Sequence, residues 1–332
     1  MSDALCPLCG ETSEQDFLPH MLHLPNGDKS FGRRRCNGCR VIYCDPMPDQ
    51  VEIEYVYKHF YDYAWYLKNR FFKKLQSWHR YHRLKKIFND KKFGWKPGAI
   101  LDIGSGHGWF LDAALKDGWS AFGIDRLDDD EVRRMHLRGI EVETRPLEDV
   151  RYTAGSFDLI TLWHVLEHIV DPRQALQRVE RLLKPGGYCV IAVPNRDSVT
   201  FSDVGAQWGW LQEPFVHVWT FAAGTLRLVM PAGIEIVEVT SRDTWDQQRF
   251  QYSTLFRWYN RYVLYAIRLP RKLAHALKCD QLFILLDALH NFCYWGSLAL
   301  SYAVYSALRR FFFGRYERDL RANELMVILR KA

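Results

Sequence analysis

The chain has 332 residues, of which 48% are hydrophobic, 15% aromatic and 25% charged, with a formal net charge of +6. This composition is typical of a globular protein and excludes a disordered chain. The modest positive charge indicates an anionic partner only where basic residues are concentrated. The first residues lack the basic and apolar segments of a secretory signal, so we expect a cytoplasmic protein.

Residues 1–45 contain two C-x-x-C pairs. Each pair brings two thiolates together, and two pairs supply the four soft ligands of a tetrahedral zinc. A redox pair is the alternative, but it usually stands alone in a thioredoxin-like pattern that is missing here. Four cysteine ligands leave no open position for a substrate, so we expect a structural zinc. The predicted ligands of this zinc ribbon are Cys6, Cys9, Cys36 and Cys39.

Residues 46–96 are dense in aromatic and basic side chains, and their apolar residues recur at helical spacing. This spacing predicts one or two helices ahead of the first strand of the next unit. A basic, aromatic segment is also found in nucleic-acid-binding proteins, but no recognised nucleic-acid-binding fold accompanies it. We therefore expect no nucleic-acid partner.

The sequence ILDIGSGHGWFLDAAL, residues 100–115, predicts a strand, a glycine-rich turn and a helix. Such a turn brings backbone N–H groups close to a nucleotide. The glycines are spaced G-x-G-x-G, and Trp109 stands where a dinucleotide fingerprint has its third glycine, which disfavours NAD. A second predicted strand, SAFGI, is followed by Asp125, at about the distance where a carboxylate binds ribose hydroxyls.

With these motifs the sequence resembles the class I S-adenosylmethionine-dependent methyltransferases, and among them bacterial enzymes that modify sugars and lipids. SFDLITLWHVLEHIVDP, LLKPGGYCVIAVPN, MPAGIEIVEV and NELMVILRKA resemble the fourth to seventh strands in the family's order. The resemblance covers residues 97–245 and 322–332. It implies an α/β fold with a Rossmann-like seven-stranded sheet whose last strand is antiparallel. It also implies that residues 46–96 form a helical lid, with Tyr57, Tyr61 and Tyr66 contacting the cofactor.

The resemblance implies a binding site for S-adenosylmethionine in which the glycine turn holds the methionine part and Asp125 the ribose. Asp102 has a structural alternative as the cap of the turn. Pro146 stands where relatives carry an acidic residue, so the adenine contact falls to the two residues that follow it. The expected cofactor contacts are Asp102, Gly104, Ser105, Gly106, Gly108, Asp125, Leu147, Glu148 and Trp163.

Methyl transfer to a hydroxyl requires an aligned nucleophile, exclusion of water and removal of a proton. The loops after the fourth and fifth strands should face the transferred methyl. Because histidine titrates near neutral pH, His217 is the first candidate for the general base and His164 the second. Either residue has the alternative role of a packed, hydrogen-bonded histidine, and we expect that role for His168, on a helix after the first loop. The tryptophans of the second loop are expected to cover a hydrophobic or sugar-like acceptor.

A catalytic cation is an alternative that comes from a second resemblance. In the quinone-biosynthesis O-methyltransferases, carboxylates and a histidine after the fourth strand hold a divalent cation. The corresponding residues here are His164, Glu167 and His168, with histidine replacing one carboxylate.

Residues 246–321 separate the sixth and seventh strands and hold twelve Lys and Arg against five Asp and Glu. Residues 292–308 carry no charge and are followed by the basic segment RRFFFGR, residues 309–315. This pattern favours helices that lie on the inner face of a membrane, with contact through residues 250–315. The alternative is that these helices pack on the domain or across a homodimer.

The combined interpretation is a methyltransferase with an N-terminal zinc ribbon and a helical insertion. The expected reaction is O-methylation of a hydroxyl on a glycan, a lipid-linked saccharide or an amphipathic isoprenoid. A nucleotide-sugar C-methyltransferase is one alternative, because that group shares the zinc-ribbon plan. A binding or scaffold protein that keeps the cofactor fold without turnover is the other.

Overall fold

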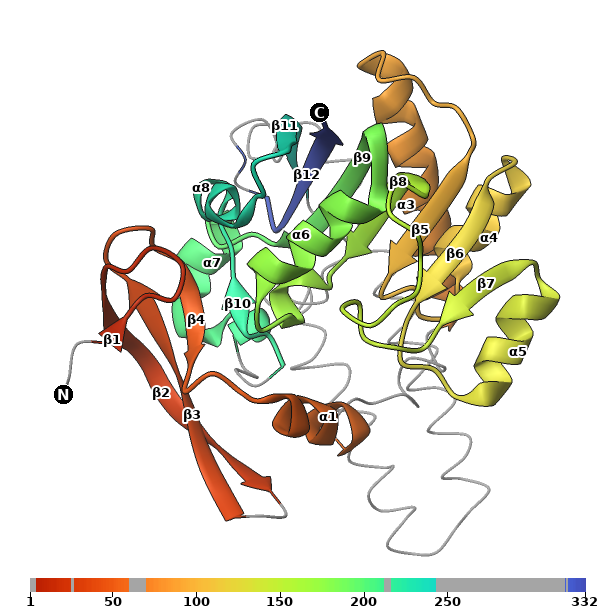
Figure 1. Cartoon of the computed structure of the whole chain (residues 1–332). Helices are drawn as coiled ribbons and strands as arrows, with labels where there is room; N and C mark the ends of the chain where they lie inside the picture. Colours follow the sequence, from red (N-terminus) through yellow and green to blue (C-terminus); the bar gives the residue numbers. More distant parts are fainter. Residues whose placement is uncertain (1–3, 25–26, 60–69, 212–215, 243–319, 321) are drawn as a thin grey trace, which may run out of the picture.

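The structure is a computed structural model that describes residues 4–24, 27–59, 70–211, 216–242, 320 and 322–332 (Figure 1). The expected contacts of Tyr61 and Tyr66 lie outside these residues. So does the predicted membrane-facing or dimer-forming insertion, of which the structure describes only Leu320.

The larger of two sheets has seven strands in the order β11-β12-β9-β8-β5-β6-β7. Neighbouring strands from β7 to β9 are parallel, whereas β12 pairs antiparallel with both β9 and β11. The predicted fold, with an antiparallel last strand, is therefore confirmed. The strands are β5 (Ala99–Ile103), β6 (Ser120–Ile124), β7 (Ile140–Glu143), β8 (Phe157–Trp163), β9 (Leu183–Pro194), β11 (Ile234–Arg242) and β12 (Glu324–Lys331).

Helices cover both faces of this sheet (Figure 1). Successive residues of a strand point to opposite faces, so Leu101 of β5 joins one apolar cluster and Ile100 the other. The first cluster includes the buried face of α6 (Pro172–Leu182), and the second includes α3 (Arg70–Asp90), α4 (Trp109–Lys116) and α5 (Asp129–Leu137).

Helix α3 packs on the face of the sheet, and the role of residues 46–96 as a lid over the cofactor stays a prediction. Tyr81, Leu84 and Phe88 are buried on one side of this helix. The Tyr81 hydroxyl donates a hydrogen bond of 2.7 Å to Asp117, directly after α4. By contrast, α1 (Gln50–His59) reaches the carboxyl ends of the strands, where Tyr57 lies 6.2 Å from the ring of His168.

The smaller sheet has five strands in the order β1-β2-β3-β4-β10 and lies beside the larger one (Figure 1). Its fifth strand, β10, belongs to the loop after β9. The N-terminal strands β1 to β4 therefore share a sheet with a loop of the larger unit. The strands are β1 (Ala4–Leu5), β2 (Thr12–Leu24), β3 (Gly27–Cys36), β4 (Ile42–Asp45) and β10 (Trp219–Thr220). We call β1 to β4 the ribbon.

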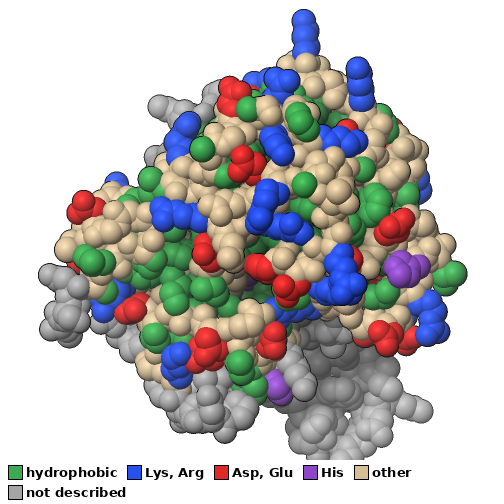
Figure 2. All heavy atoms as spheres, viewed as in Figure 1, with side chains coloured by type: hydrophobic (Ala, Val, Ile, Leu, Met, Phe, Trp, Pro, Cys, Tyr) green, Lys and Arg blue, Asp and Glu red, His purple; other side chains and the backbone are tan. Residues whose placement is uncertain are grey.

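Short helices complete the described structure: α7 (Val199–Val204), α8 (Ala223–Leu226), η1 (Leu166–His168), η2 (Gly205–Gln207), η3 (Gly209–Leu211) and η4 (Arg227–Val229). In the described part of the chain, no helix combines the length and the apolar character needed to cross a membrane. Lys and Arg side chains alternate with Asp and Glu on the face shown in Figure 2, so that face presents no large surface of one sign.

Candidate active site

The glycine turn joins the end of β5 to α4. Gly104, Gly106 and Gly108 have φ angles of 74°, 52° and 71°, a backbone region that side chains disfavour. A Cβ atom on Gly104 would lie only 2.3 Å from Cγ2 of Val165, in the loop after β8. The backbone N–H of Gly106 donates a hydrogen bond of 2.6 Å to Oδ2 of Asp125. The turn, the acidic residue after β6 and the loop after β8 therefore meet at the carboxyl end of the sheet.

Asp102 and Ser105 line the same region with buried polar groups. Thr161 donates a hydrogen bond of 2.6 Å to Asp102 Oδ1, so the aspartate is bound to β8. Burial raises the pKa of Asp102 to about 7. Ser105 Oγ is buried and has no hydrogen-bond partner within the described residues. A positively charged amino group would satisfy the Asp102 carboxylate, which fits the methionine part of S-adenosylmethionine. Ser105 Oγ instead points at β6, where a Cβ on Gly123 would lie 2.6 Å from it.

The remaining expected cofactor contacts differ in exposure. Leu147 is buried in the core, whereas Glu148 is exposed. Trp163, the last residue of β8, is 8% exposed, and the guanidinium of Arg80 lies 5.4 Å from its ring centroid.

Two histidines from different loops lie side by side. The rings of His168 and His217 have centroids 4.7 Å apart. His217 Nδ1 lies 2.9 Å from the carbonyl oxygen of Trp210, and His168 Nδ1 lies 2.8 Å from that of Val216. A carbonyl oxygen only accepts, so each Nδ1 carries the hydrogen and each Nε2 keeps a lone pair in the neutral ring. Burial lowers the pKa of His217 well below its ordinary value, which favours this neutral form.

His164 is held differently, between two carboxylates. Its Nε2 lies 2.9 Å from Glu324 Oε2 and its Nδ1 lies 3.3 Å from Glu167 Oε1. Burial opposes the charged form, but the hydrogen bonds to Glu167 and Glu324 raise the pKa of His164 above its ordinary value. Both ring nitrogens are thereby directed at acceptors, so this geometry disfavours His164 as a general base. Its φ of 57° is an uncommon value for a side-chain-bearing residue.

The loop after β8 also brings a carboxylate to the two paired histidines. One ligand atom from each of Glu167, His168 and His217 lies within 4.8 Å of the others. Glu167 is fully buried, and beyond the 3.3 Å contact of its Oε1 with His164 Nδ1 its oxygens accept no hydrogen bond within the described residues. These three residues could hold a metal ion. They differ from the cation ligands expected from sequence because His217 takes the place of His164.

The comparisons with known proteins identify a family. The family described as "Methyltransferase domain" matches residues 68–239, more than half of the chain. The chain belongs to this methyltransferase family. Methyltransferases of this kind use S-adenosylmethionine, and we expect this cofactor at the glycine turn.

Among curated proteins, the methyltransferase is 32% identical over 117 residues to a ubiquinone biosynthesis O-methyltransferase of Bordetella avium, covering 33% of this chain and 48% of that protein. It is 29% identical over 154 residues to the enzyme of the same name from Pseudomonas paraeruginosa, covering 44% of this chain and 65% of that protein. The methyltransferase thus spans about half to two thirds of the length of these curated relatives.

Solved structures of methyltransferases are also similar. The crystal structure of a SAM-dependent methyltransferase from Archaeoglobus fulgidus has a TM-score of 0.47 at 15% identity, covering 81% of this chain and 100% of that one. That of a possible histamine N-methyltransferase from Thermotoga maritima has a TM-score of 0.43 at 22% identity, covering 57% and 85%.

The tryptophans of the loop after β9 do not form the expected cover as a group. Trp208 is fully buried with Ile42 and Leu211. Trp219 is buried too, and its Nε1 donates a hydrogen bond of 2.9 Å to the carbonyl of Ile169. Both are core residues because the ribbon packs on this loop. Trp210 alone of the three is half-buried, and its ring stacks on His164 at 5.4 Å and 4°.

Four cysteines of the methyltransferase cluster at the tip of the ribbon. The sulfur atoms of Cys6, Cys9, Cys36 and Cys39 all lie within 4.8 Å of one another. The distance is 3.8 Å from Cys6 to Cys39 and 3.3 Å from Cys9 to Cys36. Four sulfurs this close are the kind of donor set that a tetrahedral structural zinc prefers, and zinc at this site stays a prediction.

Sequence reasoning missed two groups that shape the site. Glu324 opens β12 and holds His164, and Arg242 Nε donates a hydrogen bond of 2.8 Å to it. The signal was a charged residue at the head of an apolar strand. His168 lies on a short helix after the loop, η1, as expected, but its ring faces His217, which the sequence did not indicate.

Proposed function

We propose that this methyltransferase methylates a hydroxyl group of a small amphipathic acceptor, with His217 as the general base. The acceptor class is a glycan, a lipid-linked saccharide or an isoprenoid-type molecule. The observation that carries the proposal is the hydrogen bond of 2.9 Å between His217 Nδ1 and the Trp210 carbonyl. It leaves the basic nitrogen, Nε2, free to take a proton.

The loop after β8 lies between His217 and the glycine turn where the cofactor is expected. Val165 packs against Gly104, and two residues later Glu167 begins the contact with His168 and His217. S-adenosylmethionine supplies an activated methyl group at the turn. In the proposed mechanism, the acceptor oxygen would bond to the methyl carbon as the carbon–sulfur bond breaks, with release of S-adenosylhomocysteine. His217 Nε2 would accept the hydroxyl proton, and the Trp210 carbonyl would keep the ring oriented.

The proposed cofactor contacts are the glycine turn, with Asp102 and Ser105 at the methionine end and Asp125 at the ribose. Oδ2 and Oδ1 of Asp125 accept hydrogen bonds from Gly106 and Arg126, which hold the carboxylate beside the turn. Leu147 and Glu148 remain the proposed adenine contacts. For Trp163, the proposed role is to pack beneath the cofactor rather than to bind it through a polar atom.

Oxygen is favoured as the acceptor atom because the printed names of the curated relatives say O-methyltransferase. Half to two thirds of those proteins aligns with this chain, so the activity is a proposal for the whole protein. Carbon is the alternative acceptor atom.

A divalent cation is the second candidate for activating the hydroxyl. Histidines that bind metals commonly donate their other N–H to a backbone carbonyl, and His168 and His217 both do so. With the buried carboxylate of Glu167 they form a two-histidine, one-carboxylate set. A cation there would lower the pKa of a bound hydroxyl and leave His217 as a ligand.

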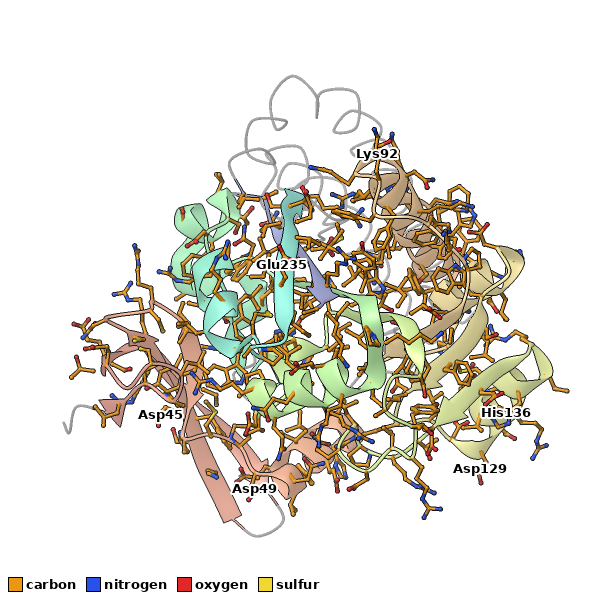
Figure 3. The ribbon with its side chains drawn as sticks, turned by 45° about the horizontal axis from the view of Figure 1, so that its top comes forward. Asp45, Asp49, Lys92, Asp129, His136 and Glu235 are labelled. Atoms are coloured by element: carbon orange, nitrogen blue, oxygen red, sulfur yellow. The ribbon has the colours of Figure 1, made fainter. Side chains whose placement is uncertain are left out.

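The test is transfer of a radiolabelled methyl group to three probes: a long-chain alkyl catechol, an alkyl glycoside and a nucleotide sugar. We expect label on a hydroxyl probe, recovered as methyl iodide after cleavage of the ether with hydriodic acid. His217→Asn should lower turnover by about 10² to 10⁴. His136→Asn, at an exposed histidine of α5 (labelled in Figure 3), is the matched control and should leave turnover unchanged.

Different results lead to different conclusions. Label that resists cleavage of the ether indicates carbon as the acceptor. Cofactor binding without transfer to any probe favours the scaffold alternative. Loss of activity on dialysis against a chelator, with recovery in Mg²⁺ or Mn²⁺, favours the cation over the base.

A further inference from the structure

One arginine of the ribbon is buried against the loop that carries His217. Arg33, on β3, is 1% exposed. Its Nη1 donates a hydrogen bond of 2.7 Å to the carbonyl oxygen of His217, and its Nε donates one of 3.3 Å to that of Leu211. The guanidinium therefore joins the two described ends of the segment from 211 to 217, across a sequence distance of 184 residues.

The partners of this arginine are unusual for a buried charge. Both are neutral carbonyl groups, and no carboxylate forms an ion pair with Arg33 in the described part of the chain. Burying a charge without a carboxylate partner is costly. An arginine suits this position because its planar guanidinium can donate to two acceptors at once, whereas the ammonium group of lysine is a compact single charge.

Other contacts attach the same loop to the ribbon. The Cys44 N–H donates a hydrogen bond of 2.9 Å to the Val218 carbonyl, and β4 pairs with β10 through Tyr43 and Trp219. Ile42 packs with Trp208 and Leu211 in a small buried cluster. The loop after β9 leaves the large sheet, so the ribbon supplies much of the structure that holds it.

We propose that Arg33 is a positioning residue for the acceptor site. It fixes the carbonyls of Leu211 and His217 on either side of the Trp210–His217 hydrogen bond, and so it holds the His217 ring in place from the ribbon. The catalytic part of this inference rests on the proposed role of His217, but the loop-ordering part does not. The ribbon then acts on acceptor turnover, while the cofactor turn is held by the large sheet.

The test compares Arg33→Met and Arg33→Lys with Arg34→Met in the full-length protein. Arg34 is the matched control because it lies next along β3, and its hydrogen bonds in the described part of the chain go to the ribbon: Asp45 Oδ2 at 2.5 Å and the Ser13 carbonyl at 3.4 Å. Asp45, at the end of β4, is labelled in Figure 3. Amide hydrogen exchange is measured on peptides that cover residues 208–220 and 99–125, together with the affinity for S-adenosylhomocysteine.

We expect Arg33→Met to raise exchange in residues 208–220 by about tenfold or more, with residues 99–125 and the affinity for S-adenosylhomocysteine changed by less than about twofold. Arg33→Lys should restore part of the protection, and Arg34→Met should behave as wild type. Turnover of the alkyl catechol should fall by about tenfold or more in Arg33→Met, through kcat as well as KM.

Unchanged exchange in residues 208–220 would overturn the proposal, as would an equal rise in residues 99–125 in both Arg33 variants. If Arg33→Met does not fold, Arg33→Lys decides by the same comparison. A wild-type protein that methylates none of the probes would count against the proposed function. The exchange data would still decide whether Arg33 orders the loop.

Discussion

Glu324 Oε2 lies 2.9 Å from His164 Nε2 and joins the first residue of β12 to the loop after β8. The same carboxylate accepts a hydrogen bond from Arg242 Nε, on β11. Glu324 is 1% exposed, so the last strand of the sheet contributes a buried charge to the edge of the candidate site.

Glu324→Gln should destabilise the protein, because it removes the buried counter-charge of Arg242 and one of the two carboxylates beside His164. Removing one partner of a buried ion pair costs about 3–5 kcal/mol. Burial opposes ionisation, but Arg242 and His164 hold the pKa of Glu324 well below its usual range. A carboxylate whose pKa is lower in the folded than in the unfolded protein stabilises the fold. This stabilisation is complete above the pKa of the unfolded protein and is lost as pH falls through the pKa of the folded protein. The difference from wild type in urea unfolding should therefore be largest near neutral pH and shrink in acid.

The control for that measurement is Glu238→Gln. Glu238 pairs with Lys91 at 2.8 Å, but the lysine side chain is 50% exposed. An exposed pair contributes about 1 kcal/mol or less. A loss in Glu324→Gln no larger than in this control would show that the buried pair does not support the fold.

The pH dependence of turnover reports on His217. A general base is active above its pKa and loses activity as pH falls through it. Because burial lowers the pKa of His217 well below 6.5, turnover of the alkyl catechol should stay level through neutral pH and decline only under more acidic conditions. His217→Asn should remove this acid limb along with most of the activity. A wild-type decline centred above pH 6.5 would contradict the assignment.

The seven-stranded sheet was predictable because each strand carries its own local signal. The glycine turn, Asp125 and the four cysteines also lie in short motifs whose spacing indicates their chemistry. Their neighbours in space then follow from the order of the strands, as when the Gly106 N–H meets Asp125 across adjacent strand ends.

The environment of the histidines was not predictable in the same way, since it depends on contacts between distant parts of the chain. His164 is held by Glu324, 160 residues later, and the carbonyl of His217 by Arg33, 184 residues earlier. Trp208 resembles a substrate cover in sequence, but the packing of the ribbon against its loop makes it core. No local sequence pattern indicates these contacts between distant residues.

Gly104→Ala should weaken cofactor binding. The new Cβ would require Val165 Cγ2, 2.3 Å away, to move, and a φ of 74° is strained for alanine. Calorimetry with S-adenosylhomocysteine should show a loss of affinity of about tenfold or more, equivalent to about 1.4 kcal/mol. Gly155→Ala is the matched control: its φ is 68°, but its Cβ would meet nothing within 4 Å. It should cost about 1–2 kcal/mol of stability without changing affinity. Equal affinities in both variants would argue against a cofactor at this turn.

Membrane contact by residues 246–321 remains a prediction from sequence. The full-length protein should float with vesicles that contain phosphatidylglycerol, and binding should weaken at high salt because basic residues attract anionic headgroups. Arg257, Arg261 and Arg268 carry part of that charge, so replacing all three with glutamate should reduce flotation. Protein that stays at the bottom of the gradient with anionic vesicles would reject this proposal. A dimer in sedimentation velocity would then favour packing between two copies.

The four clustered cysteines predict one zinc per chain, and their removal should act on the loop that carries His217. A structural zinc supplies much of the folding free energy of a small ribbon. Cys36→Ser should therefore lose most of the metal, measured on the purified protein. Cys189→Ala, which removes a buried thiol of β9, should keep the metal.

Loss of the metal should also affect the loop that carries His217. Because β4 pairs with β10, it should increase hydrogen exchange at Trp219 and Thr220, while residues 102–125 stay protected. Equal metal content in the two variants would rule out the zinc, and protection of the loop after metal loss would show that the ribbon holds it without metal.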